Sequence, residues 1–253
     1  MDREKHGENS SSPNVNLTVT SIQGGTAREG SQPACRVELS SGSSFFISLD
    51  DLIALGIQKG TEVGEGLKAD LRTAHRRRRV RARALDYLNR RDHSRRELLT
   101  KLEKRFLYPR QKPHSPPPRP LDPEDREEFR LICQEVADDM VRLGFVDDLR
   151  YAQNWVVLRL KRHPEGLSAL SAGLARHGVD REVIDQVLLP YREGDMTSDA
   201  LERAGAKLIK RSKRTGAGVM RSLLQKGFSY PEIRRWMEEK GIDPRGLEPE
   251  DGE

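Results

Sequence analysis

The stretch LLQKGFSYPEI, residues 223–233, ends one helix and begins the next. Leu223 continues an apolar helical stripe, and Gly227 is the residue type that most often stops a helix. Ser229 and Glu232 then follow with the spacing of a capping box, in which the two side chains bond the exposed N–H groups at a helix start. This order predicts two short helices joined by a tight turn.

The same arrangement occurs three times along the chain. Each repeat is expected to contain three helices. The middle helix of each repeat ends at Leu102 to Phe106, Leu174 to Val179 and Leu224 to Phe228. The period is roughly 50 residues once a proline-rich segment is set aside, which is in the range of helical solenoid repeats. The units agree in register only to within one residue, so we interpret them as homologous and not identical. The pattern predicts a mainly helical protein with three tandem three-helix units.

The segments outside the helices have a different composition. Residues 1–14 are polar and charged, which predicts a disordered N-terminus. Residues 15–66 alternate apolar and polar side chains between Gly and Ser breaks, which predicts a small β-rich arm. The remaining boundaries are expected as follows: repeat 1 at 67–147, with a proline-rich insert at 108–120; repeat 2 at 148–194; repeat 3 at 195–241; and an acidic tail at 242–253.

Composition limits the class of protein. Of 253 residues, 35% are hydrophobic, against roughly 45–50% in an average globular chain, so several thin cores are expected and not one deep core. Cys35 and Cys133 have no CxxC partner, which favours buried thiols over a disulfide or a metal site. No apolar run approaches the roughly 20 residues of a membrane helix. We therefore expect a cytoplasmic protein with no membrane contact.

Charge is distributed in blocks. Residues 76–105 contain 13 basic residues against four acidic ones, and residues 203–235 contain 10 against one, so each block has a net charge of +9. Residues 122–148, which lie between them, have a net charge of −7. Two basic blocks on either side of an acidic one favour a polyanion-binding surface with a defined order of charges over a uniformly basic surface.

The basic blocks supply the candidate binding residues. Four arginines at 76–79 occupy a whole helical turn, so we expect that no helix can hide them, and few acids lie nearby in the sequence to neutralise either block. Clustered guanidinium groups bind phosphate oxygens and release counterions, which points to the backbone of DNA. The candidates are Arg76, Arg77, Arg78, Arg79, Arg90, Arg91, Arg95, Arg96, Lys210, Arg211, Lys213, Arg214, Arg221 and Lys226.

Aromatic residues argue against base stacking as the main mode of binding. Trp155 and Trp236 lie on apolar helical stripes, where a core position is favoured over a stacking platform. Contacts to the nucleic-acid backbone should therefore dominate, and binding should depend steeply on salt.

Catalytic and metal-binding motifs are not found in the sequence. The six histidines are isolated, and there is no HExxH, GxxxxGK[ST] or GxSxG pattern. Gly216-Ala217-Gly218 is interpreted as a helix start. The pairs Asp147-Asp148 and Asp138-Asp139 are interpreted as a helix cap and a solvated face. We expect a protein that is not an enzyme and that uses no cofactor or metal.

Several of these segments resemble the RecX family of RecA regulators. Residues 84–91 (ALDYLNRR) with 94–98 (SRREL) are similar to its opening repeat, and so are residues 143–148 (LGFVDD) before Arg150-Tyr151-Ala152. Gly166, Leu170, Leu174, Gly178 and Val179, and residues 226–229 (KGFS), resemble the middle-helix ends of its second and third repeats. The strands that end at Gly60 resemble a β arm that some members carry. The resemblance covers about residues 15–241, and its specificity lies in the ordered series of motifs.

The resemblance implies three helix-turn-helix-like units in an elongated, curved array that binds the RecA filament on single-stranded DNA, with duplex DNA as a further ligand. It implies a monomeric modulator of RecA that inhibits strand exchange and ATP hydrolysis in recombination, DNA repair and the SOS response. The insert at 108–120 and the acidic helix after it depart from the family pattern and put the docking geometry in doubt. We expect that acidic helix to face away from DNA.

Two other functions fit the residues alone. A helix-turn-helix transcription regulator would need an exposed helix that reads bases, usually in a dimer, and footprinting of a specific duplex would reveal it. A helical-repeat scaffold for protein interactions would bind no nucleic acid at all.

Overall fold

The computed structural model describes residues 17–26, 33–108, 120–193, 196–211 and 215–244. The predicted disordered N-terminus, nearly all of the proline-rich insert, the tail after residue 244, Lys213 and Arg214 lie outside these residues. Contacts divide the chain into two compact units, residues 1–86 with 119–133, and residues 87–118 with 134–253. Each unit is described by itself.

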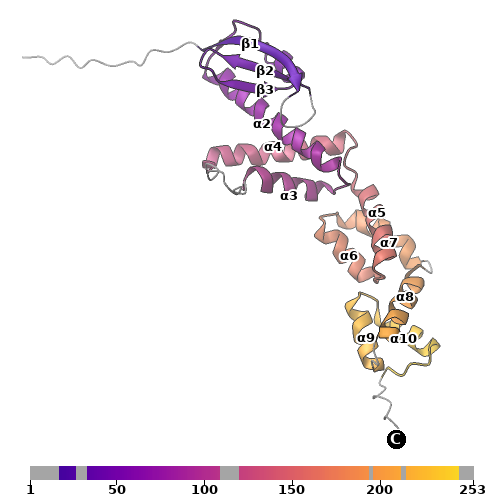
Figure 1. The fold of residues 1–253 in the computed structure, drawn as a ribbon. Coiled ribbons are helices and arrows are strands. Elements are labelled where there is room, and N and C mark those ends of the chain that lie inside the picture. Colours follow the sequence, from indigo (N-terminus) through magenta and orange to yellow (C-terminus); the bar gives the residue numbers. More distant parts are fainter. Residues whose placement is uncertain (1–16, 27–32, 109–119, 194–195, 212–214, 245–253) are drawn as a thin grey trace, which may run out of the picture. The chain divides into compact units, whose positions relative to one another are not determined.

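The first unit contains a four-stranded antiparallel sheet (Figure 1). Its strands are β1 (Leu17–Thr26), β2 (Pro33–Leu39), β3 (Ser44–Ile47) and β4 (Glu62–Val63), in the order β3-β2-β1-β4. Alternate residues such as Val19, Val37 and Ile47 are buried, and Leu71 of the following helix joins their core. The expectation of a small β-rich arm is confirmed, because the period-two pattern places one apolar face of the sheet against a helix.

Three helices accompany this sheet. They are α1 (Leu49–Ala54), α2 (Glu65–Leu88) and the first part of α4 (Pro123–Arg142). The Asp122 side chain accepts a hydrogen bond from the N–H of Asp125 at 2.7 Å, which caps α4 before its proline in the first turn. Cys35 and Cys133 are both buried, as predicted.

The second unit is built from short helices joined by tight turns. Besides the end of α4 it contains α3 (Arg95–Phe106), α5 (Asp148–Arg162), α6 (Leu167–Arg176), α7 (Arg181–Glu193), α8 (Met196–Arg211), α9 (Gly216–Gln225) and α10 (Tyr230–Glu239). The capping box at Ser229 and Glu232 is present, and Gly216 begins α9 with Thr215 as its cap. A mainly helical chain with a small N-terminal sheet and three successive groups of three helices is therefore confirmed.

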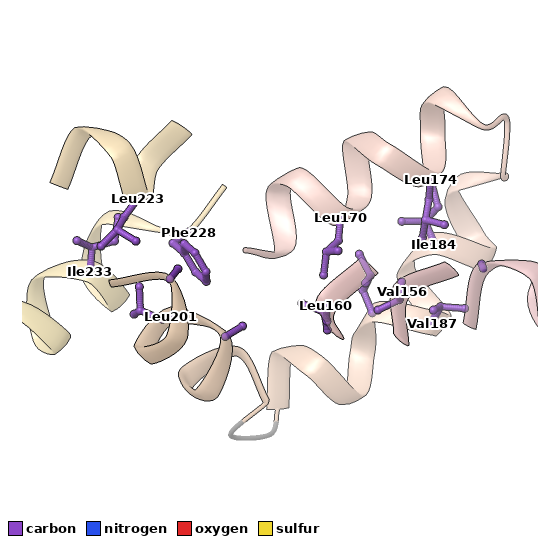
Figure 2. Packing of buried hydrophobic residues seen from close by; sticks show 14 of the residues in the cluster. Val156, Leu160, Leu170, Leu174, Ile184, Val187, Leu201, Leu223, Phe228 and Ile233 are labelled. Atoms are coloured by element: carbon purple, nitrogen blue, oxygen red, sulfur yellow. The ribbon is translucent and has the colours of Figure 1, made fainter. Parts of the chain in front are cut away.

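Buried side chains of α5 to α10 form one continuous core. Leu170 and Leu174 of α6 lie close to Val156 and Leu160 of α5, and Leu223, Phe228 and Ile233 form the equivalent layer further along (Figure 2). This core is separate from that of the sheet. Further buried residues, such as Leu98, Leu102 and Met140, belong to neither of these clusters, which agrees with the expectation that no single deep core exists.

Within the second unit, two pairs of neighbouring three-helix groups are joined by the same kind of contact. Ser94, before α3, donates its hydroxyl to the carbonyl of His177 at the end of α6. Gly166, before α6, donates its N–H to the carbonyl of Lys226 at the end of α9, at 2.9 Å. In each case the start of one middle helix contacts the end of the next middle helix. Gly178 and Gly227 follow these carbonyls with φ of 75° and 82°, which reverses the chain and exposes its backbone for contact.

Candidate nucleic-acid interface

Arg76 is a structural residue. Its guanidinium forms ion pairs with Asp125 and Glu128 of α4 and lies 4.9 Å from the centre of the Phe129 ring. The Arg76 side chain is only 11% exposed. The acids that neutralise it are about 50 residues away in the sequence, and they come from the acidic helix that was expected to face away from the DNA-binding surface.

The other arginines of this turn differ in exposure. Arg78 is 6% exposed, while Arg77 remains 41% exposed with its guanidinium 3.6 Å from the Asp51 carboxylate. Arg79 is half-buried. The expectation that no helix can hide residues 76–79 is therefore wrong for Arg76 and Arg78. A long side chain can be covered by neighbouring helices when a carboxylate or an aromatic face compensates its charge.

The turn between α2 and α3 also pairs its arginines. Arg91 donates to Glu97 at 3.1 Å, and Arg95 Nε donates to Asp138 at 2.6 Å. The backbone N–H of Arg95 donates to the carboxylate of Asp148 at 2.8 Å. Burial raises the pKa of Asp148, and this hydrogen bond opposes the rise. Asp147 caps α5 by accepting from the N–H of Arg150 at 3.0 Å.

Arg90 and Arg96 remain exposed at this turn. Neither forms an ion pair with a residue that the structure describes. The aliphatic part of Arg96 covers Gly178 so closely that a Cβ at that glycine would overlap it. Of the first block's candidates in the second unit, Arg90 and Arg96 thus keep cationic groups available for a phosphate.

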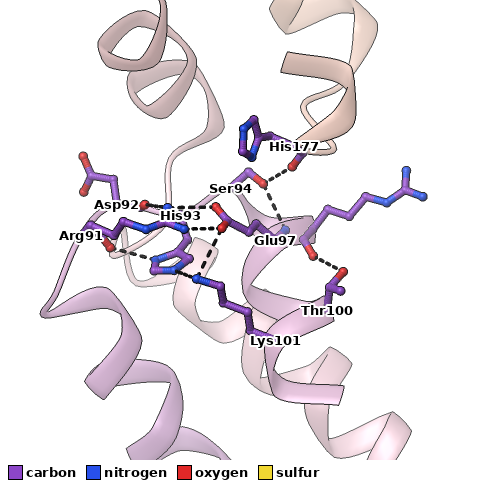
Figure 3. A network of polar contacts seen from close by, with 9 residues as sticks. Arg91, Asp92, His93, Ser94, Glu97, Thr100, Lys101 and His177 are labelled. Atoms are coloured by element: carbon purple, nitrogen blue, oxygen red, sulfur yellow. Dashed lines mark hydrogen bonds and ion pairs between the residues drawn. The ribbon is translucent and has the colours of Figure 1, made fainter. Parts of the chain in front are cut away.

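His93 lies at the centre of a buried polar network beside this turn. Figure 3 shows its ring between the Arg91 carbonyl, 2.8 Å from Nδ1, and the Lys101 ammonium, 2.7 Å from Nε2. A neutral ring fits both contacts, with Nδ1–H donating and Nε2 accepting. Burial, together with the charges of Arg91 and Lys101, lowers the pKa of His93. The charge of Glu97 opposes this shift.

Carboxylate and phenol groups complete the network. Burial alone would raise the pKa of Glu97, but the hydrogen bond from Arg91 and the nearby positive charges lower it overall. Burial raises the pKa of Tyr151 to about 12, and the charge of Glu97 adds to the shift. At neutral pH the network therefore holds a carboxylate, a neutral phenol and a neutral imidazole between two cations.

The network predicts how stability depends on pH. Folding lowers the pKa of His93 from its ordinary value of about 6.5. Below that pH the unfolded chain therefore binds more protons than the folded protein does. The free energy of unfolding should therefore fall as the pH decreases from about 7.5 to about 5.5, and His93→Gln should make that fall shallower. Urea unfolding followed by tryptophan fluorescence measures both slopes.

A matched variant at the exposed His163 should keep the slope of the unchanged protein. Identical slopes for the His93 variant and the unchanged protein would contradict the assignment of a buried, neutral ring.

The second basic block keeps more of its charges available. Lys207, Lys210 and Arg221 are exposed and Lys226 is half-buried, and none of the four forms an ion pair with any residue in the described part of the chain. We call these four the third-repeat cations. Lys207 and Lys210 belong to α8, and Arg221 and Lys226 belong to or directly follow α9. They present ammonium and guanidinium groups that a phosphate can bind.

Lys207 was not among the residues predicted from the sequence, although it lies three residues before Lys210 and so on the same side of a helix. The remaining candidate in this block, Arg211, lies at the end of α8.

The tryptophans occupy core positions, as predicted. Trp236 is 5% exposed, and its indole N–H donates to Glu202 at 2.6 Å. Trp155 is half-buried and packs so closely on Gly173 that a Cβ there would overlap the indole. Both indoles thus pack against the helical core.

No group of three or more His, Cys, Asp or Glu side chains among the described residues is placed to hold a metal ion. None of the described helices combines the length and the apolar character needed to cross a membrane.

Comparisons with known proteins agree on one family. Residues 147–188, from the cap of α5 into α7, match the family model described as RecX, second three-helix domain. A protein named Regulatory protein RecX from Bacillus pumilus (strain SAFR-032) is 23% identical over 201 residues, which cover 78% of this chain and 68% of the relative. The RecX of Bacillus subtilis (strain 168) is 26% identical over 196 residues, which cover 76% of this chain and 61% of the relative.

Solved structures show the same fold. A crystal structure of regulatory protein RecX matches with a TM-score of 0.66 and 20% identity, covering 88% of this chain and 99% of that one. The match at the second helical unit and the relatives aligned along most of the chain both support a protein of the RecX family of regulatory proteins, and the solved structure shows that the fold is shared.

Proposed function

We propose that this protein binds the filament that RecA forms on single-stranded DNA and restrains the recombinase, and that it acts by binding and not by catalysis. It would thereby limit strand exchange and ATP hydrolysis during recombination, DNA repair and the SOS response. The observation that carries the proposal is the set of third-repeat cations, which have no ion-pair partner among the described residues. Similarity to the RecX family supports the choice of filament as ligand.

The third repeat is the stronger candidate for the DNA contact. In the first block, Arg76, Arg91 and Arg95 already have carboxylate partners, so a phosphate would have to displace an existing ion pair. At Lys210 and Arg221 a phosphate displaces only water and counterions, and the released counterions favour binding. The first block then contributes chiefly through Arg90 and Arg96.

Neutralising the third-repeat cations should weaken DNA binding. With Lys210→Gln, Arg221→Gln and Lys226→Gln combined, we expect about tenfold weaker binding of a single-stranded oligonucleotide at low salt, and a salt slope reduced by about 2 if all three contact phosphates. Fluorescence anisotropy at several salt concentrations measures both quantities.

Arg234→Gln is the matched control, because Arg234 is already paired with Glu238 at 2.9 Å and should leave the slope unchanged. An unchanged slope in the triple variant would remove the third repeat from the interface.

The function itself is tested on the filament. The protein is titrated into the single-stranded-DNA-dependent ATPase reaction of the cognate RecA, below one molecule per RecA and at two salt concentrations. Inhibition far below a one-to-one ratio is expected, since a filament regulator acts on many protomers at once. No effect at a several-fold excess would overturn the proposal and favour a DNA-binding or scaffold role.

A further inference from the structure

One side of α5 is exposed and carries both apolar and cationic side chains. Its members recur every three or four residues, so they lie along one side of the helix: Arg150, Asn154, Val157, Leu158 and Lys161. All five are exposed, whereas Val156 and Leu160 on the opposite side belong to the helical core. We call these five residues the α5 face.

The apolar residues of the α5 face take no part in the core of the second unit. Val157 and Leu158 are 55% and 54% exposed, and neither belongs to the helical core or to the side chains packed against it. An amphipathic helix of a soluble protein carries polar residues on its outer side. Packing within the fold therefore does not account for this adjacent aliphatic pair, which offers an apolar area to a partner.

Cations border the aliphatic pair at both ends of the α5 face. Arg150 lies seven residues before Val157, Lys161 lies four residues after it, and neither forms an ion pair with any residue that the structure describes. Arg203 of α8 adds a cation at the second end, because its guanidinium donates to the Leu160 carbonyl at 3.3 Å. Arg203 is itself exposed and also has no ion-pair partner among the described residues.

The stability of the helix explains only part of this charge. Lys161, in the last turn of α5, interacts favourably with the unpaired carbonyls at that helix end, but Arg150, in the first turn, lies at the end where a cation is unfavourable. The one acid within α5, Asp148, already accepts a hydrogen bond from the N–H of Arg95 at 2.8 Å. The cations of the α5 face are thus available to acids of a partner.

The mixture of groups favours a protein partner over nucleic acid. Phosphates would bind the cations but would leave Val157 and Leu158 against a charged backbone, and aliphatic side chains offer bases no aromatic ring on which to stack. Protein interfaces combine apolar residues at the centre with polar groups around them. A second copy of this chain is disfavoured, because both ends of the α5 face are cationic and a symmetric pairing would bring like charges together.

We propose that the α5 face docks on a protein surface in which carboxylates surround an apolar patch. The inference rests on the proposed function in taking this surface to belong to the recombinase protomers of the filament. From Arg150 to Lys161 the face extends about 16 Å along the helix axis, which is small against the roughly 800 Å² that each partner buries in a stable complex. The docking is therefore weak by itself and adds to the affinity of the DNA contact through the shared chain.

A double variant tests the aliphatic pair. Val157→Gln with Leu158→Gln removes the apolar area and keeps a residue type that favours helices. Half-inhibition of the DNA-dependent ATPase of the cognate RecA should need about tenfold more of this variant, since two half-exposed aliphatic side chains lose their burial on the partner. Its affinity for a single-stranded oligonucleotide should change by less than about twofold, because no cation is removed.

The matched control is Leu189→Gln in α7. Leu189 is exposed to a similar extent, 48%, but it lies one helical turn from Asp185 and Arg192, which pair with each other at 2.8 Å. This variant should inhibit as well as the unchanged protein does. Equal urea unfolding curves for all three proteins, followed by tryptophan fluorescence, would show that neither change disturbs the fold.

Hydroxyl-radical footprinting identifies what covers the α5 face. The radicals oxidise exposed side chains, and mass spectrometry measures the oxidation of Val157 and Leu158 in the full chain. We expect the RecA filament to protect both residues, and a single-stranded oligonucleotide alone to protect neither. Protection by the oligonucleotide alone would assign the face to nucleic acid, and protection that grows with the concentration of this protein alone would assign it to a second copy. Either result would overturn the proposal.

The outcomes keep the two proposals apart. If the unchanged protein inhibits the ATPase and the double variant inhibits it equally well, the role of the α5 face is overturned and the proposed function stands. If the unchanged protein has no effect on the ATPase, the proposed function fails, and the footprint on the filament still decides whether the α5 face docks there.

Discussion

Gly227→Ala is expected to lower the free energy of unfolding of the second unit by about 2–5 kcal/mol. Two costs add at this residue. Its φ of 82° is unfavourable for any residue with a Cβ, by about 1–2 kcal/mol. A Cβ there would also overlap the backbone and Cβ of Ala169 at the start of α6, and overpacking of this kind costs about 1–3 kcal/mol.

Tryptophan fluorescence can measure the unfolding of this unit. Both tryptophans, Trp155 and Trp236, belong to the second unit, so their fluorescence during urea unfolding reports on that unit. Gly241→Ala is the matched control, because Gly241 ends a helix with φ of 66° but has open space around its Cβ position. It should cost only about 1–2 kcal/mol. Equal losses in the two variants would show that the contact between Gly227 and Ala169 can accommodate a Cβ.

Arg76→Gln is expected to lower the stability of the first unit by about 2–4 kcal/mol. Removing the guanidinium leaves the carboxylates of Asp125 and Glu128 without their main partner, and breaking a fully buried ion pair costs about 3–5 kcal/mol. The two carboxylates are 34% and 31% exposed, so water compensates part of that loss. Hydrogen exchange of the peptide amides of residues 123–133 measures the effect, because α4 depends on this contact with α2.

The control for Arg76 is its neighbour in the sequence. Arg77→Gln removes a more exposed guanidinium that lies 3.6 Å from Asp51, and an exposed pair of this kind contributes at most about 1 kcal/mol. DNA affinity should change little in the Arg76 variant. A large loss of oligonucleotide affinity with normal hydrogen exchange would instead return the main DNA contact to α2.

Local patterns were sufficient for most of the secondary structure. Ser229 and Glu232 predicted the start of α10, and Asp122 before Pro123 predicted the start of α4, because a helix cap depends on residues within one turn of each other. Glycines at 178 and 227 marked helix ends for the same local reason. The alternating apolar residues of β1 and β2 predicted strands, since one face of the sheet is buried.

The candidate site was predicted less well, because charge compensation is not local. The sequence showed few acids near Arg76, Arg91 and Arg95, but helix packing brings Asp125 and Asp138 from α4 to two of them. Arg78 looked exposed for the same reason. Among the described residues, Arg90 and Arg96 of the first block and Lys210, Arg221 and Lys226 of the second form no ion pair, as their sequence suggested.

Sequence patterns were enough for the class of the protein: a mainly helical chain with a small β-rich segment, helices in three groups of three, and two basic blocks on either side of an acidic one. These features depend on periodicity, capping and composition, which act over a few residues. The tertiary structure alone decided which arginines are structural and which lysines remain available. That choice depends on which helix packs against which, and so on contacts between residues far apart in the chain.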